Sequence, residues 1–281
     1  MEIGKIDSFT VYILESLHEG DQRTGDNLRD DLRQYQYDNI GFPLNYEYHV
    51  IDDEIALRTM LSAIEQVTSS TNSIPIIQLE CHGNVDGIEL SSYQRISWID
   101  FFDLIRPINI ASLNLLLLNL SMCYSESIIR SIDPRKRAPF RAMAGPIGKA
   151  YPIPLQSSWS DFYKKYCDSL LKQENNEDMG ICAIAQSCNL IYYEQEFIFD
   201  VHYDTPNLLP ELFEQWTNEE LAKMYNEEGP LMLDVAMYKK WKANKLKRMY
   251  DSYKAFYCFY DVREKLEKTY KKLLGPEKFH L

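Results

Sequence analysis

The chain has 281 residues, of which 45% are hydrophobic and 26% charged, and its formal net charge at pH 7 is −12. This length allows one large domain, or a domain with an appendage, to bury a sizeable core. The acidic balance argues against a general nucleic-acid-binding protein, and no apolar run approaches the roughly 20 residues of a transmembrane helix. The N-terminal segment lacks the features of a secretory signal, so we expect a cytoplasmic protein without membrane association.

Strand and helix patterns alternate along the first half of the chain. In order, the periodicities predict a strand at 9–16, a helix ending near Gln36, a strand at 46–52, a helix at 53–67 capped by Asp52 or Asp53, a strand at 74–80, a hairpin at 84–92, a helix at 97–108 capped by Ser97 and a strand at 113–120. The last of these strands is apolar on both faces, which is typical of a parallel sheet covered on both sides by helices.

The pattern continues beyond residue 120 and then changes. It predicts a short helix at 125–132, a strand at 140–148, helices at 157–173 and 179–193, and a strand at 194–204. From about Thr217, which has capping-box spacing with Glu220, the pattern predicts helix almost to the end of the chain, with an aromatic-rich apolar stripe. We therefore expect an α/β domain over 1–215 with a mostly parallel sheet, and a helical C-terminal extension over 216–281.

The six cysteines are too sparse for a disulfide scaffold and form no CxxC pair. They stand at Cys81, Cys123, Cys167, Cys182, Cys188 and Cys258. Most are expected to be small buried apolar side chains, and we expect neither a metal nor a cofactor.

Two of the most strand-like runs end on residues that can carry chemistry. "IIQLECHG" ends on His82-Gly83, and "LNLLLLNLSMCYS" reaches Cys123 just after its strand. The connection between them has the length of a crossover, which tends to place consecutive strands side by side with their carboxyl ends at one rim. We therefore expect the imidazole and the thiol to lie within a few ångströms of each other.

Such a pair supports nucleophilic catalysis. A free thiol has a pKa of about 8.5, and an adjacent imidazole can take its proton. The predicted helix that follows Cys123 would favour a thiolate through its N-terminal dipole. The backbone N–H groups of Gly83 and Cys123 are the expected donors to an oxyanion.

At these residues the chain resembles the caspase-like cysteine peptidases, which include caspases, metacaspases, separase and the bacterial CHAT proteases. Their shared pattern is an apolar strand ending in His-Gly and a second apolar strand ending in the nucleophilic cysteine. The resemblance implies a caspase-like fold and a cysteine endopeptidase that cleaves protein substrates. It assigns Cys123 as the nucleophile, His82 as the general acid/base, and the N–H groups of Gly83 and Cys123 as the oxyanion hole.

The departures from the family pattern are informative. The animal-caspase pentapeptide is replaced by "SMCYS", and Ser121 stands where metacaspases have an aspartate two residues before the cysteine. A preference for a basic residue at P1 is therefore not supported. The overall pattern is nearest the bacterial CHAT type, which implies activation by a partner or ligand, for instance in bacterial defence, with a regulator bound through the C-terminal helices.

Other readings of the same residues stay open. The fold could serve as a non-catalytic interaction or scaffold module in which the thiol is unused. A basic, aromatic-interleaved run at 239–250 could bind nucleic acid, although a solvated helix face is the more common meaning of such a run. His18 could line the same rim as His82, whereas His49 and His202 are expected to be structural, and the segment 133–138 to be a solvated loop.

Overall fold

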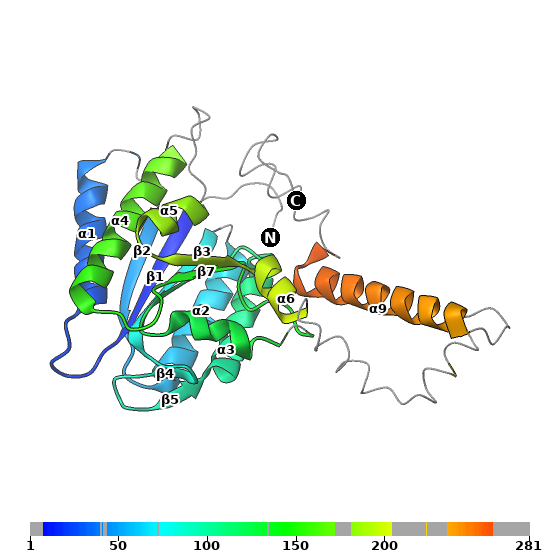
Figure 1. The fold of residues 1–281 in the computed structure, drawn as a ribbon. Coiled ribbons are helices and arrows are strands. Elements are labelled where there is room, and N and C mark those ends of the chain that lie inside the picture. Colours follow the sequence, from blue (N-terminus) through cyan, green and yellow to red (C-terminus); the bar gives the residue numbers. More distant parts are fainter. Residues whose placement is uncertain are drawn as a thin grey trace.

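The computed structural model describes residues 8–39, 41, 44–71, 73–133, 135–171, 181–203, 223 and 235–260. Its elements are β1 (Ser8–Ser16), α1 (Thr24–Asp38), β2 (Leu44–Val50), α2 (Glu54–Ser70), β3 (Ser73–Gly83), β4 (Gly87–Glu89), β5 (Arg95–Ser97), α3 (Trp98–Ala111), β6 (Leu117–Ser121), the 3-10 helix η1 (Ser125–Ser131), β7 (Ala142–Gly145), α4 (Pro152–Leu171), α5 (Ile181–Ser187), β8 (Ile191–Glu194), α6 (Gln195–Tyr203) and α9 (Val235–Tyr257). The predicted alternation of strands and helices is therefore present (Figure 1).

The central sheet has the order β2-β1-β3-β6-β7-β8. All neighbouring pairs in it are parallel except β7 with β8, and β4 and β5 form an antiparallel hairpin against the end of β3. The prediction of an α/β fold with a mostly parallel sheet is confirmed. Such a sheet places the carboxyl ends of β1, β3 and β6 at one rim.

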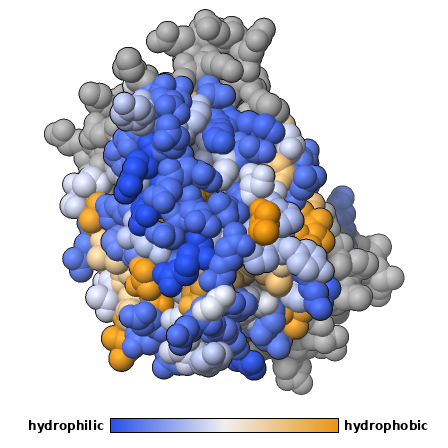
Figure 2. All heavy atoms as spheres, turned by 90° about the vertical axis from the view of Figure 1, so that its left-hand side faces the viewer, coloured by the Kyte–Doolittle hydropathy of each residue, from blue (hydrophilic) through white to orange (hydrophobic). Residues whose placement is uncertain are grey.

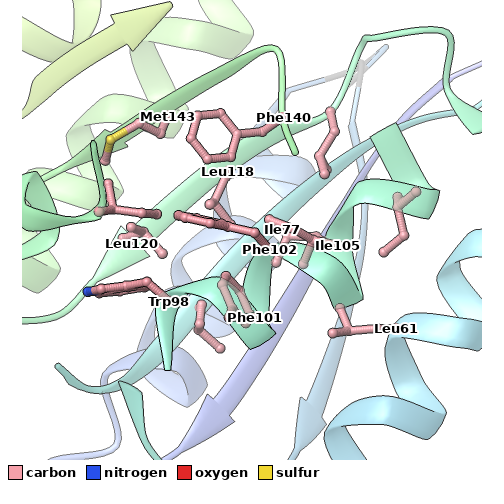
Figure 3. Close-up of a cluster of buried hydrophobic side chains, with 14 of the residues drawn as sticks. Leu61, Ile77, Trp98, Phe101, Phe102, Ile105, Leu118, Leu120, Phe140 and Met143 are labelled. Carbon is pink, nitrogen blue, oxygen red and sulfur yellow. The ribbon is translucent and has the colours of Figure 1, made fainter. Parts of the chain in front are cut away.

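Helices cover both faces of the sheet because the strands are apolar on both sides. Alternate residues of β3 point to opposite faces, so Ile76 packs with α1, α4 and α5, and Ile77 packs with α2 and α3. On the second face, Trp98, Phe101 and Phe102 of α3 pack against Leu118 and neighbouring side chains (Figure 3). Burial of these large side chains is the main stabilising contribution to the fold.

The helix starts follow the predicted caps. Asp53 accepts a hydrogen bond from the Ala56 N–H at 2.7 Å, and Ser97 accepts one from the Asp100 N–H at 3.2 Å. Both caps satisfy amide groups that have no partner within the helix. They fix where α2 and α3 begin, and therefore how each crossover leaves the rim of the sheet.

Two predictions between residues 179 and 204 were wrong. The helix predicted over 179–193 ends at Ser187, Asn189 adopts a left-handed conformation (φ 60°), and Ile191–Glu194 form β8, antiparallel to β7. The strand predicted over 194–204 is helix α6. The sequence of this segment alternates as in a strand, but its described buried residues, Gln195, Ile198 and Phe199, have the three- and four-residue spacing of a helix.

Helix α9 extends away from the sheet, and its C-terminal end lies beside α6 (Figure 1). Tyr257, Cys258 and Phe259 at that end are buried in the same cluster as α3. Lys240, Lys247 and Arg248 in the predicted basic run are exposed. The boundary predicted near residue 215 and the capping pair Thr217 and Glu220 lie outside the described residues.

The segment 133–138 is only partly the solvated loop that was expected. The Arg137 guanidinium lies over the rings of Phe256 and Phe259, at 4.1 and 4.7 Å from their centroids, and donates to the Phe256 carbonyl at 2.6 Å. The segment therefore holds the end of α9 against the body. None of the described helices is both long enough and apolar enough to cross a bilayer.

Candidate active site

Strands β3 and β6 are direct neighbours, as the crossover argument predicted. Their register pairs Glu80 with Ser121 at the last step. His82 and Cys123 each follow two residues later, so the two strands deliver them to the same rim of the sheet. The first requirement of the proposed dyad, adjacent strand ends, is met.

Gly83 brings the two strand ends into contact. A Cβ atom added to Gly83 would lie 2.7 Å from the Cys123 carbonyl oxygen and 2.8 Å from the Met122 side chain. Real Cβ atoms do not approach backbone oxygen so closely, so any larger residue would push the segments apart. Glycine at this position is a condition for the close packing of the two segments.

The His82 imidazole is held by a carboxylate that the sequence analysis did not identify. Its Nε2 lies 2.8 Å from Oδ2 of Asp21, and the same oxygen accepts a hydrogen bond from the His18 backbone N–H at 2.9 Å. Burial alone would raise the pKa of Asp21, but the hydrogen bonds from the His82 ring and the His18 amide outweigh it and hold that pKa below its ordinary value. Asp21 is therefore ionised at neutral pH and acts as the acceptor, so His82 Nε2 carries the proton.

Three aromatic rings are stacked at this rim. The ring of His18 lies between those of Tyr93 and His82, with centroid distances of 4.1 and 4.6 Å. His18 is therefore on the same rim as His82. Of the His82 side chain, 46% is exposed, so the imidazole is accessible from solvent.

The Cys123 thiol lies against the loop that follows β7. The Ala150 N–H donates to Sγ at 3.4 Å, and the thiol contacts the Ala150 carbonyl at 3.7 Å. Cys123 is partly exposed. The predicted helix after it is the seven-residue 3-10 helix η1, entered through Tyr124 in a left-handed conformation (φ 59°). This short element weakens the dipole argument for a thiolate.

The thiol and the imidazole do not form a hydrogen bond with each other in this conformation. The His82 ring is directed to Asp21 and the thiol to Ala150. The structure therefore brings together the strand ends and backbone segments of the two residues, while their reactive atoms have other partners.

The two backbone N–H groups expected to bind an oxyanion are those of Gly83 and Cys123. The Asn84 N–H donates to the Gly87 carbonyl at 3.0 Å, so residues 84 and 87 are a hydrogen-bonded pair of the β3–β4 ladder. Hydrogen-bonded and non-hydrogen-bonded pairs alternate in an antiparallel ladder, so the neighbouring pair, Gly83 with Ile88, exchanges no backbone hydrogen bonds. The Gly83 N–H therefore points away from β4. The Cys123 N–H donates to none of the residues that the structure describes.

Two buried glutamates lie beneath this rim and were also not predicted. Glu15 and Glu80 are opposite each other on β1 and β3, and both are buried. Glu15 accepts from the Gly25 N–H at 2.8 Å and pairs with Arg23 at 2.5 Å. Burial raises the pKa of Glu80 to about 7, although hydrogen bonds from neighbouring groups such as Thr24 oppose the shift.

The remaining predicted residues are distributed as follows. Ser121 is buried on β6, opposite Glu80 of β3. Cys81 is buried on the opposite face from His82, in the cluster with α2 and α3. His49 lies on β2 beside Glu47, at 3.1 Å. His202 belongs to α6, and nothing is described of its side chain.

No protein-family model matches the chain, and no curated protein is significantly similar to it.

Proposed function

We propose that the chain is a cysteine endopeptidase of caspase-like fold, with Cys123 as the nucleophile and His82 as the general acid/base. The observation that carries the proposal is the pairing of β3 with β6, which sets His82-Gly83 and Cys123 at one rim with Gly83 against the Cys123 carbonyl. An exposed imidazole and a partly exposed thiol, just beyond the ends of adjacent strands, are the two side chains that acyl transfer requires.

In the proposed reaction, the imidazole takes the thiol proton and the thiolate attacks the peptide carbonyl carbon. The carbonyl electron pair moves to oxygen, where the N–H groups of Gly83 and Cys123 stabilise the charge. Collapse of the intermediate breaks the C–N bond, and the imidazolium returns its proton to the leaving amine. Water then hydrolyses the thioester, with the imidazole accepting its proton. Asp21 acts as a positioning residue that orients the imidazole.

This mechanism requires a change from the present conformation. The Cys123 thiol would have to exchange its contacts with Ala150 for one with the imidazole. Such catalytic hydrogen bonds often form only with substrate bound. We further propose that a protein regulator or substrate supplies this change, with the C-terminal helices as its docking region.

A second candidate function is a non-catalytic interaction module. It is favoured by the separate partners of the two reactive groups, Asp21 for the imidazole and Ala150 for the thiol. In this alternative the basic, exposed residues of α9 would bind an acidic protein or nucleic-acid partner.

Thiol labelling separates the two functions. The full chain is treated with an iodoacetamide or acyloxymethylketone probe, and the modified cysteines are quantified by mass spectrometry. A catalytic Cys123 reacts far faster than the exposed Cys182, and His82→Ala slows its labelling by about 100-fold or more. Equal reactivity of Cys123 and Cys182, or peptide hydrolysis that survives in Cys123→Ala, would contradict the peptidase.

A further inference from the structure

Three side chains at the candidate active site have the composition and spacing of a metal-binding group. His18, Asp21 and His82 each offer one ligand atom, and these atoms all lie within 4.8 Å of one another. His18 and Asp21 come from the loop after β1, and His82 comes from the end of β3. All three are partly exposed, so an ion could enter from solvent.

The donor set fits a divalent transition metal. Two imidazoles and a carboxylate, with a fourth position left for water, are ligands that Zn²⁺ commonly takes. With bonds of 2.0–2.1 Å, a tetrahedral zinc site needs ligand atoms about 3.4 Å apart. The closest pair, His82 Nε2 and Asp21 Oδ2, are already 2.8 Å apart. The His82–Asp21 pair would have to lengthen, and the remaining separations, which reach at most 4.8 Å, would have to shorten by about 1 Å to reach this spacing.

The hydrogen bond of His18 favours the tautomer that can bind a metal ion through Nδ1. Its Nε2 lies 3.2 Å from the Leu90 carbonyl oxygen, which can only accept, so Nε2 carries the proton and Nδ1 keeps the lone pair. A ring N–H donated to a backbone carbonyl is the usual second contact of a metal-binding histidine. The Tyr93 ring stacked on His18 restricts its orientation further. Glu89 Oε1 lies 3.6 Å from His18 Nε2, and the other oxygen of this carboxylate is paired with Arg95 at 2.6 Å.

We propose that His18, Asp21 and His82 form a Zn²⁺ site, and that Zn²⁺ bound there stops cysteine chemistry at Cys123. The second half rests on the proposed function. Zn²⁺ bound at His82 Nε2 displaces the proton that Asp21 holds there, so the proton of the neutral ring moves to Nδ1. Nδ1 then has no lone pair left to accept the thiol proton. The ion also takes the Asp21 carboxylate from its positioning contact.

The binding half is tested without any peptidase activity. Zn²⁺ is titrated into metal-free Cys123→Ala protein by calorimetry, and the melting temperature is measured with and without the ion, because a ligand of the folded state raises it. We expect one tight site. His18→Gln should weaken it by more than the roughly 10- to 100-fold typical of losing an outer-shell partner. The control is His49→Gln, which changes the histidine beside Glu47 and leaves the affinity unchanged. Equal affinity in His18→Gln and the parent overturns the site.

The regulatory half is tested on the wild-type Cys123 protein by probe labelling. Zn²⁺ should slow labelling of Cys123 in the parent, and a chelator should restore the rate. In His18→Gln, with labelling compared with its own metal-free rate, the Zn²⁺ concentration needed for inhibition should rise by the same factor as the dissociation constant for Zn²⁺. Binding without an effect on labelling overturns the inhibition alone. Slow Cys123 labelling even without metal contradicts the peptidase and leaves the binding result standing.

Discussion

Nε2 of His82 lies 2.8 Å from Oδ2 of Asp21, although the two residues are 61 positions apart in the sequence. Because Asp21 is ionised, it fixes the proton on Nε2 and leaves Nδ1 as the nitrogen that can serve a thiol. The carboxylate thus orients the ring and selects its tautomer.

Asp21→Asn should lower kcat of the proposed peptidase by about 100-fold or more, with a smaller effect on KM, because an amide no longer imposes the tautomer. The pH dependence of kcat/KM should shift as well, which a purely structural defect would not cause. The control is Asp52→Asn, an exposed aspartate near the same rim. An unchanged pH profile in Asp21→Asn would exclude the positioning role.

Gly83→Ala should abolish Cys123 labelling, because the added Cβ would lie 2.7 Å from the Cys123 carbonyl oxygen. We also expect a loss of stability of about 1–3 kcal/mol from the forced shift. Gly41→Ala is a matched control: its φ of +83° makes alanine strained, but no atom lies within 4 Å of the new Cβ. If both variants lose stability and both keep fast labelling, the close approach at Gly83 does not matter for reactivity.

Glu80→Gln should stabilise the protein at pH 8 and have little effect at pH 5. The pKa of Glu80 is raised from an ordinary 4.5 to about 7, so the folded state holds a proton that the unfolded state releases between these values. The contribution of Glu80 to the free energy of unfolding is therefore greatest below about pH 4.5 and is lost as the pH rises to about 7.

Glutamine cannot ionise, so this loss disappears in the variant. The gain at pH 8 relative to pH 5 should be on the order of 2 kcal/mol, measured by urea denaturation at both pH values. The exposed Glu47→Gln is the control. A pH-independent difference between Glu80→Gln and the parent would show that Glu80 is ionised in the folded protein.

Arg137→Ala should loosen the end of α9. The guanidinium stacks on Phe256 and Phe259 and donates to a backbone carbonyl, so we expect a loss of about 1–2 kcal/mol and faster amide exchange over residues 250–258. Arg135→Ala, which removes the partner of Asp133 in the same segment, is the comparison. Unchanged exchange in Arg137→Ala would mean that other contacts hold this end.

The parallel core of the fold could be predicted because its signals are local. The runs around Ile76 and Leu118 are apolar on both faces, and Asp53 and Ser97 mark the helix starts that separate them. The region after residue 179 was assigned wrongly because short apolar segments such as 191–194 fit either period. The strand there is decided by pairing with β7, which only the tertiary structure provides.

The candidate site was predictable only in part for the same reason. His82 and Cys123 could be found because each ends a recognisable strand. Asp21 lies in a polar loop with no periodicity, and only the folded chain brings it to His82. Glu15 and Glu80 did carry a signal, a charged residue near the end of an otherwise apolar strand, and that signal was overlooked.

The two residues of the candidate dyad are held by different kinds of structure. His82 is the tenth residue of an 11-residue strand that pairs with β4. Cys123 lies in the turn between β6 and a short 3-10 helix, and this turn is held by the loop after β7, through Ala150 and Gly148. In the proposed peptidase, a regulator would therefore act on the Cys123 thiol through residues 146–150, and the His82 imidazole would keep its position. Crosslinking residues 146–150 to a neighbouring segment would then abolish fast labelling of Cys123, while the contact of His82 with Asp21 stays unchanged.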